Sequence, residues 1–461
     1  MNEGSEERPG DEAPPSAQAD GTGPPASTQA GVTEGPPAQG PPAQGPPAAA
    51  DAVFQPFLYL HVLAVATISG FSMLAWMAGF YAAERLLWEN DFVTSHRWVF
   101  PVICLPFALL VGVLVKYLRA PTAMSESLTD SLAGDTSKVE WRRLPVSAAQ
   151  ALASLFSGAA LGPEAGLGLL SSQIAAWYGH VLRIPAARRP KLIYASVASA
   201  YNGLLENPLF AGVLGSEVAQ TRGGSYASLP ANLIGGAVGY AVFLLVGSSG
   251  LCGLLGLAPV EHIRPLDVLL IVAMTLVGML LAGITAVFFK LAAGLFARFG
   301  SPVVRALLAG VVFSIAGVIA PIVMFSGQTQ AQEVVDDPAR YGIGLLLLMA
   351  LAKLALLAVG FRSGFLGGAI FPSIFALTCV AVSLDLLLPG AEQTVLMAGL
   401  MVGYLLTLFR TPFMVILLTG FMLEVNTDMI ALIVLCAAIA MILGPLLRRL
   451  VASRRKTADT A

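Results

Sequence analysis

Charged side chains are scarce in this chain. Only 12% of its 461 residues are Asp, Glu, Lys or Arg, whereas soluble globular proteins carry about 25%. Apolar residues make up 56% of the chain, and the mean hydropathy is +0.77. The stretch 268–289 contains no charge at all, and it exceeds the roughly 20 apolar residues that cross a hydrocarbon core about 30 Å thick. The composition therefore predicts a protein of the lipid bilayer and excludes soluble enzymes and nucleic-acid-binding proteins.

Cysteine and histidine are also rare, and neither is grouped. The four residues of each type are scattered over the chain: Cys104, Cys252, Cys379, Cys436, His61, His96, His180 and His262. No paired spacing marks a disulfide framework or a zinc site, and no HExxH helix marks a metalloprotease. The sequence therefore predicts neither a metal site nor a bound cofactor.

The first fifty residues lack large apolar side chains. Acidic residues outnumber the one basic residue, Arg8, and Pro, Ala, Gly and Gln dominate, with a repeated GPPAQ unit from Gly35. Such a segment cannot offset the entropy of ordering, and it lacks the basic start and apolar core of a secretory signal peptide. We expect a disordered acidic tail over 1–50, a membrane domain over 51–450 and a short basic tail over 451–461.

Apolar runs separated by helix breakers fill the membrane domain. The candidate spans lie near 54–83, 98–118, 145–180, 191–219, 230–258, 266–293, 302–326, 342–361, 364–388, 393–422 and 428–450. They predict roughly ten to twelve crossings, some of them incomplete. Arg448, Arg449 and the basic run 454–456 directly follow the last span. Because positive charge is enriched on the inner side of membranes, these residues predict a cytoplasmic C-terminus.

Gly and Pro interrupt several runs where an ordinary spanning helix would continue. The breaks are at Gly162-Pro163, Asn207-Pro208, Gly367-Gly368 and Thr411-Pro412. They fall in similar register within two halves, about 54–258 and 266–450. Matching breaks are typical of transporters in which half-helices meet near the midplane and point at a substrate. The alternative is that membrane helices simply carry more Gly and Pro than soluble ones.

Glu164 is a lone carboxylate within a stretch of small and apolar residues, 157–168. A charge at the centre of a membrane helix costs roughly 2.5–3.5 kcal/mol on insertion scales, so it usually faces a bundle interior or a water-filled path. Pro163 suits the first helical position, which places Glu164 in the first turn, where negative charge is favoured. A carboxylate that competes with an anion for this place would be a gate. The alternative is a cap that satisfies only its own helix.

The second polar break, 360–372, contains two adjacent glycines, Gly367 and Gly368. Glycine allows close backbone approach, and the amides of Ala369 and Ile370 would be free donors at a helix start just before Pro372. Backbone amides are a suitable lining for a weakly hydrated anion. A flexible loop between two spans is the alternative, which the apolar residues on both sides disfavour.

These two stretches resemble motifs of the CLC superfamily of chloride channels and chloride/proton antiporters. The segment 162–166, GPEAG, resembles the family's G-(K/R)-E-G-P motif, and 363–372 resembles S-G-x-x-G-G-x-F-x-P, with Ile370 in place of the Phe. The segments 143–146 and 207–212 and the basic residue Lys353 keep the family's order. The resemblance covers roughly residues 55–450 and points to a divergent bacterial branch of ion-transport proteins.

The resemblance implies an all-α polytopic fold of two inverted halves whose broken half-helices meet near the midplane. It also implies a homodimer with one pore in each subunit. Glu164 would match the external gating glutamate. The backbone around it would bind the anion, through Gly162, Ala165, Gly166, Gly367, Gly368, Ala369 and Ile370.

Two positions depart from the family pattern. The family's anion-coordinating serine falls at about Ala123, so its hydroxyl is absent or is supplied by Thr122 or Ser125. The family's pore tyrosine has no clear match in 423–428, where Asn426 or Met429 could stand. The central anion site is therefore altered.

Four charged residues bear on the transport mode. Glu217 matches the first of two successive glutamates that antiporters of the family often carry, but Val218 follows it. This favours passive conduction over proton exchange, unless Glu206 or Glu424 relays protons. Lys353 has apolar neighbours throughout, and it either draws anions through the pore or pairs with a buried carboxylate.

The sequence thus predicts a multi-pass protein of the cell membrane that is not an enzyme. We expect it to carry a small inorganic anion, with or without protons. Chloride is the favoured anion, and fluoride is the alternative. A rival is an intramembrane serine protease using Gly247-Ser-Ser-Gly250, but the only later histidine, His262, lies in a linker. A third possibility is a structural or chaperoning membrane protein with a degenerate pore.

Overall fold

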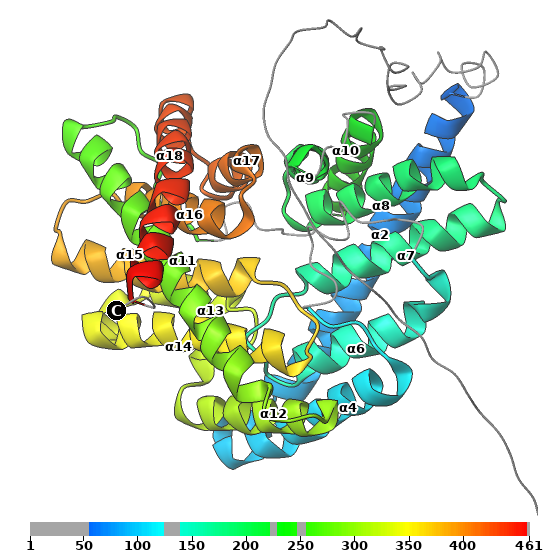
Figure 1. The fold of residues 1–461 in the computed structure, drawn as a ribbon, viewed down its shortest axis with the longest axis horizontal. Coiled ribbons are helices and arrows are strands. Elements are labelled where there is room, and N and C mark those ends of the chain that lie inside the picture. Colours follow the sequence, from blue (N-terminus) through cyan, green and yellow to red (C-terminus); the bar gives the residue numbers. More distant parts are fainter. Residues whose placement is uncertain (1–54, 124–138, 222–227, 247–254, 459–461) are drawn as a thin grey trace, which may run out of the picture. The chain divides into compact units, whose positions relative to one another are not determined.

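The computed structural model describes residues 55–123, 139–221, 228–246 and 255–458, and every regular element within them is a helix (Figure 1). Up to residue 246 the α-helices are α2 (Gln55–Trp88), α3 (Asp91–Ser95), α4 (Phe100–Leu118), α6 (Leu144–Phe156), α7 (Glu164–Val181), α8 (Arg189–Leu204), α9 (Phe210–Thr221) and α10 (Leu229–Val246). From residue 265 they are α11 (Pro265–Phe296), α12 (Pro302–Ile319), α13 (Gln328–Asp336), α14 (Gly342–Ser363), α15 (Ile370–Leu387), α16 (Gln393–Phe409), α17 (Pro412–Met422) and α18 (Thr427–Ala458). Short 3-10 turns lie between them: η1 (Arg97–Val99), η3 (Trp141–Arg143), η4 (Ala186–Arg188), η6 (Pro321–Val323) and η7 (Pro338–Arg340).

All four predicted helix breaks are confirmed. Gly162-Pro163 separates α6 from α7, Asn207-Pro208 separates α8 from α9, Gly367-Gly368 separates α14 from α15, and Thr411-Pro412 separates α16 from α17. Proline lacks the amide that a continuous helix needs, and glycine weakens the helix. The runs 145–180, 191–219 and 393–422 are therefore helix pairs rather than single spans.

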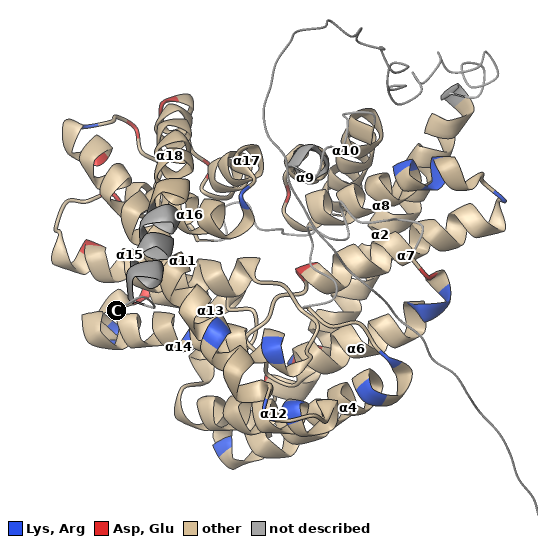
Figure 2. Cartoon of the chain, in the orientation of Figure 1, with Lys and Arg blue, Asp and Glu red and all other residues tan. Residues whose placement is uncertain are grey.

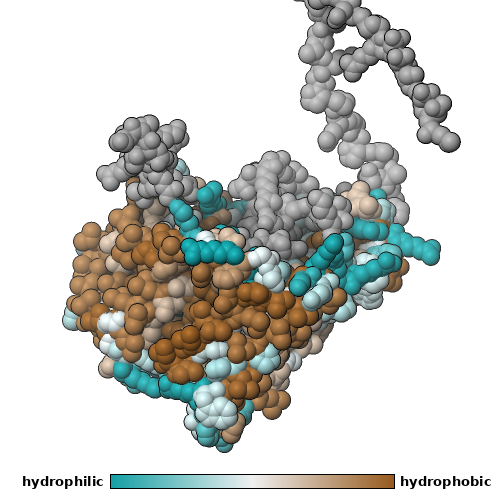
Figure 3. Space-filling model, turned by 60° about the horizontal axis from the view of Figure 1, so that its bottom comes forward, coloured by the Kyte–Doolittle hydropathy of each residue, from teal (hydrophilic) through white to brown (hydrophobic). Residues whose placement is uncertain are grey.

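Eight described helices are long and apolar enough to cross a membrane. This number is lower than the predicted ten to twelve crossings because the broken runs fold as shorter helices. Large apolar side chains on the outside include Leu86, Leu245, Ile319 and Ile442, each more than 70% exposed. On the face shown in Figure 3, hydrophobic residues form a broad area bordered by hydrophilic ones, and Figure 2 shows charged residues mainly near helix ends and in loops. The chain is thus a multi-pass membrane protein.

The helix packing repeats between the two parts of the membrane domain. In the first part α2 packs on α8 and α10, and in the second part α11 packs on α16 and α18. Across the two parts α4 packs on α12, and α9 packs on α17. The predicted all-α fold with two halves and broken half-helices is therefore confirmed, whereas the exact limits of the halves and of the two tails stay predictions.

Small residues allow the central helices of each half to approach closely. Gly399 and Gly403 of α16 lie so near α11 that a methyl group on either would overlap a backbone carbonyl of α11. Gly235 and Gly239 of α10 stand in the same relation to α8. In a bilayer, where lipid tails are as apolar as the side chains, such close backbone contact is a main source of helix association. These glycines therefore allow the close packing of α16 on α11 and of α10 on α8.

Candidate functional site

The loops before α7 and α15 are joined by two backbone hydrogen bonds. The amide of Gly162 donates to the carbonyl of Gly368 at 3.0 Å, and the amide of Gly368 donates to the carbonyl of Gly162 at 2.7 Å. Within the described residues this is the only bridge of the β type. It brings the N-termini of two half-helices from different halves together, as the pattern of breaks predicted.

Glu164 is the first residue of α7 and is only 1% exposed. Its Oε1 accepts a hydrogen bond of 2.9 Å from the amide of Phe371 in the first turn of α15, and the amide of Ile370 also faces the carboxylate. The carboxylate therefore caps the half-helix of the opposite half, where unpaired amides favour negative charge. Pro163 is the N-cap residue, one place earlier than its predicted position inside the helix.

Two glycines make room for this carboxylate. A Cβ atom on either Gly162 or Gly368 would overlap the Glu164 side chain. The second carboxylate oxygen, Oε2, is buried and has no hydrogen-bond partner among the described residues. A buried anionic oxygen without a partner is costly. The place that Glu164 occupies thus does not fully satisfy the carboxylate.

We predict that Gly368→Ala destabilises the protein by about 1–3 kcal/mol, because the added carbon needs the space of the Glu164 carboxylate. The loss should be smaller in a Glu164→Ala background, where that space is vacant. A double-mutant cycle of unfolding free energies in detergent measures this coupling. Gly283→Ala serves as the control, since no atom lies within 4 Å of its added carbon. Additive losses at Gly368 and Glu164 would contradict the arrangement.

Most of the predicted site residues converge on this junction. The structure brings together Gly162, Glu164, Ala165, Gly166, Gly367, Gly368, Ala369 and Ile370. Ala369 is the N-cap of α15 and Ile370 is its first residue, so the predicted helix start before Pro372 is confirmed. Whether their amides bind an anion stays a prediction.

The segment that replaces the family's serine loop reaches the same region. The amide of Ala123 donates to the carbonyl of Phe365 at 2.9 Å, so this segment packs against the loop before α15. Ala123 is only 3% exposed and has no hydroxyl to offer. Thr122 lies beside it, near Gly364, whereas Ser125 lies outside the described residues. A hydroxyl donor from this segment stays a prediction for Thr122 and Ser125.

Glu217 is engaged at another helix start. Its Oε1 accepts a hydrogen bond of 2.8 Å from the amide of Phe413, and its Oε2 accepts one of 2.9 Å from the amide of Met414. Glu217 on α9 thus caps α17, which belongs to the opposite half. Its part in a proton path stays a prediction.

Lys353 is fully buried in α14, where two backbone carbonyls and an aromatic ring surround its ammonium group. Its Nζ donates to the carbonyl of Met324 at 2.6 Å and to that of Phe325 at 2.8 Å, and it lies 4.8 Å from the centre of the Phe375 ring. Within the described part of the chain no carboxylate forms an ion pair with Lys353, and the alternative role in drawing anions through the pore stays a prediction. Two backbone dipoles and an aromatic face hold this cation instead.

Sequence reasoning missed several side chains that hold the site. The hydroxyl of Tyr201 on α8 donates to the backbone carbonyl of Glu164. On α6, Ser154 Oγ accepts a hydrogen bond of 2.9 Å from the amide of Leu366, and Gln150 donates to the carbonyl of Gly364 at 3.0 Å. No local pattern marks these residues, because each contact joins segments that are far apart in the sequence.

Comparisons with known proteins agree with this geometry. The family model described as voltage gated chloride channel matches residues 107–444. Curated relatives named "Putative ion-transport protein YfeO", from Escherichia coli (strain SE11) and Shigella boydii serotype 4 (strain Sb227), are each 24% identical over 391 residues, covering 82% of this chain and 90% of the relative. The comparisons give no support to a serine protease, and the segment 247–250 lies outside the described residues.

Two solved structures share the fold. The structure of a slow cyanobacterial Cl⁻/H⁺ antiporter matches with a TM-score of 0.71 at 18% identity, covering 86% of this chain and 99% of that chain. The structure of a CLC-type fluoride/proton antiporter matches with a TM-score of 0.67 at 17% identity, covering 84% of this chain and 94% of that chain. At such identities the likeness establishes the fold.

Proposed function

Because the chain belongs to the voltage gated chloride channel family, which makes it a CLC-type anion transporter, we propose that Glu164 closes its pore and that its substrate is chloride. The observation that carries this proposal is the Glu164 carboxylate bound at the start of α15, between Gly162 and Gly368. Backbone amides at a helix N-terminus bind anions in general. The carboxylate therefore occupies the place of a transported anion, which can enter when the side chain leaves.

The lining of the site supports chloride as the substrate. Its donors are backbone amides of the half-helix starts, surrounded by buried apolar residues such as Leu161, Ile370 and Phe371. Such a lining suits an anion that sheds its hydration shell easily. Fluoride is the second candidate, because a solved structure of the same fold is that of a fluoride/proton antiporter.

Passive conduction is the transport mode that the residues near Glu217 support. Both carboxylate oxygens of Glu217 are bound by amides of α17, and position 218 is a valine, which cannot carry a proton. The structural neighbour titled a Cl⁻/H⁺ antiporter makes proton coupling the alternative. We further propose a homodimer in the cell membrane with its C-terminus in the cytoplasm, since basic residues follow the last span.

A flux assay with purified protein in liposomes tests this function. Vesicles loaded with potassium chloride or potassium fluoride are diluted into a medium without that anion, valinomycin is added, and anion release and internal pH are followed. We expect chloride release well above that of empty vesicles, without matching proton uptake. Release of neither anion would favour the degenerate pore, and proton uptake in fixed ratio to chloride would replace conduction by exchange.

A further inference from the structure

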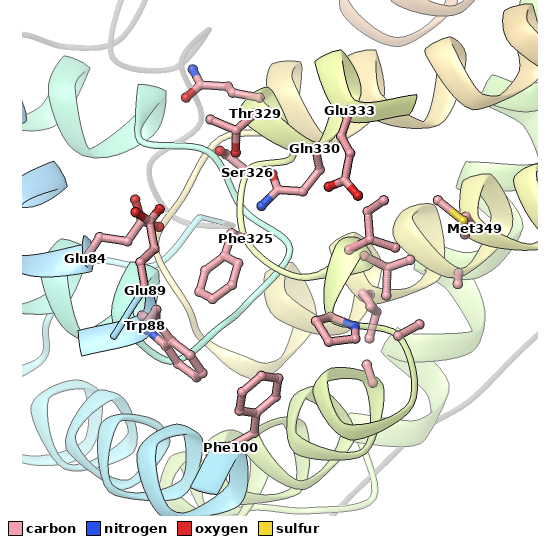
Figure 4. A pocket seen from close by; sticks show the side chains of 18 of the residues that line it. Glu84, Trp88, Glu89, Phe100, Phe325, Ser326, Thr329, Gln330, Glu333 and Met349 are labelled. Atoms are coloured by element: carbon pink, nitrogen blue, oxygen red, sulfur yellow. The ribbon is translucent and has the colours of Figure 1, made fainter. Parts of the chain in front are cut away.

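A cavity of about 1600 Å³ lies among α2, the end of α12, the segment 321–330 and α14 (Figure 4). Figure 4 shows Glu84 and Glu89 on one side, Glu333 on another, and Phe325 between them. None of the residues described as lining the cavity belongs to α7 or α15, and Glu164 is only 1% exposed. The side chains of the cavity wall therefore separate this cavity from the junction of the half-helices.

Tyr81 and Gln328 form part of the cavity wall and are joined to each other. The hydroxyl of Tyr81 donates to Oε1 of Gln328 at 2.9 Å. Tyr81 belongs to α2 in the first half, and Gln328 begins α13 in the second half. This hydrogen bond thus joins the two halves at the cavity wall, as the backbone hydrogen bonds between Gly162 and Gly368 join them at the junction.

The part of α2 that precedes Tyr81 contacts the start of α7. Trp76 of the same helix packs against Ala165 and Gly166 in the first turn of α7. Tyr81 therefore lies on a helix that borders both the cavity and the α7 side of the junction.

Gln328 lines the cavity on the side of α15. It follows Gly327, whose φ of +88° allows the turn and whose backbone lies against the side chain of Phe375 on α15. Lys353 fixes the preceding residues by donating to the carbonyls of Met324 and Phe325. Gln328 is thus held in place from α14 and α15, which makes it a fixed partner for Tyr81.

We propose that Tyr81 and Gln328 form a second closure of the pore, on the cavity side of Glu164. An anion released from the junction reaches the cavity only when the hydrogen bond between these two side chains opens. The two closures act in series, so each limits flux when the other is open. This inference rests on the proposed function, and it adds a barrier of different chemistry, because neither side chain carries a charge.

The test compares Tyr81→Phe and Gln328→Leu with the wild type in the liposome flux assay. Each variant removes one partner of the hydrogen bond, so we expect flux to rise about threefold to tenfold. The double variant should be no faster than the faster single variant, because the same bond is lost. The rise should also appear in a Glu164→Gln background. Folding defects lower flux, so an increase identifies a barrier.

Tyr341→Phe is the matched control. Tyr341 lines the same cavity, but its hydroxyl donates to Glu333 at 2.6 Å rather than across the two halves, so its flux should equal that of the wild type. Flux of Tyr81→Phe and Gln328→Leu within twofold of the wild type, or below it, would overturn the second closure while leaving the proposed function intact. Absence of flux in the wild type and all variants would overturn both.

Discussion

Glutamine in place of Glu164 is expected to raise chloride flux at neutral pH by roughly tenfold and to remove its dependence on pH. The carboxylate is held by a charge-assisted hydrogen bond from Phe371 and by the dipole of α15. Hydrogen bonds to charged groups are worth about 1.5–3 kcal/mol, and each 1.4 kcal/mol is a factor of ten. A neutral amide of nearly the same shape loses most of this attraction and leaves the site more often.

The sign of the pH dependence follows from the same contact. Protonation neutralises Glu164 and weakens its attraction to the α15 amides, so wild-type flux should rise as the pH falls. Glutamine cannot be titrated, so its flux should stay constant over the same range. Glu140→Gln is the control, because Glu140 is an exposed carboxylate paired with Arg143. If the Glu164→Gln variant kept the wild-type pH profile, Glu164 would not be the gate.

Methionine in place of Lys353 is expected to lower the free energy of unfolding by about 2–5 kcal/mol. Methionine has a similar length but no donors, so the carbonyls of Met324 and Phe325 would lose their partner. A buried polar group left without a hydrogen bond costs about 1–3 kcal/mol. Denaturant titration of the protein in detergent measures the change.

Lys290→Met provides the comparison for this experiment. Lys290 is exposed on α11, so the same substitution there should change the unfolding free energy by less than about 0.5 kcal/mol. Equal, small effects at both positions would show that Lys353 is not held as the structure describes. A large loss at Lys353 alone would confirm that two carbonyls depend on its ammonium group.

The sequence predicted those features that depend on the local backbone. Proline and glycine interrupt a helix wherever they stand, so the breaks at Gly162-Pro163 and Gly367-Gly368 could be located without a structure. The isolation of Glu164 in an apolar stretch could also be read directly, because a buried charge is costly in any fold.

The partners of these residues could not be predicted. Glu164 and Phe371 are 207 residues apart, and Tyr201 touches Glu164 through a backbone carbonyl, which leaves no mark on sequence composition. For Lys353 a carboxylate partner was one of two alternatives, because opposite charges are the usual partner of a buried cation. In the structure its ammonium group donates hydrogen bonds to the carbonyls of Met324 and Phe325. Only the fold brings that turn next to α14.

The paired amides of Gly162 and Gly368 restrict how transport can proceed. In many transporters built from two repeats, alternating access arises when one repeat rocks as a rigid body against the other around a fixed substrate. Here such rocking would have to break the two backbone hydrogen bonds between Gly162 and Gly368, beside the proposed anion site. Under the proposed function, anion movement by rotation of single side chains would leave these two hydrogen bonds intact, and turnover would then depend on local barriers rather than on reorientation of domains.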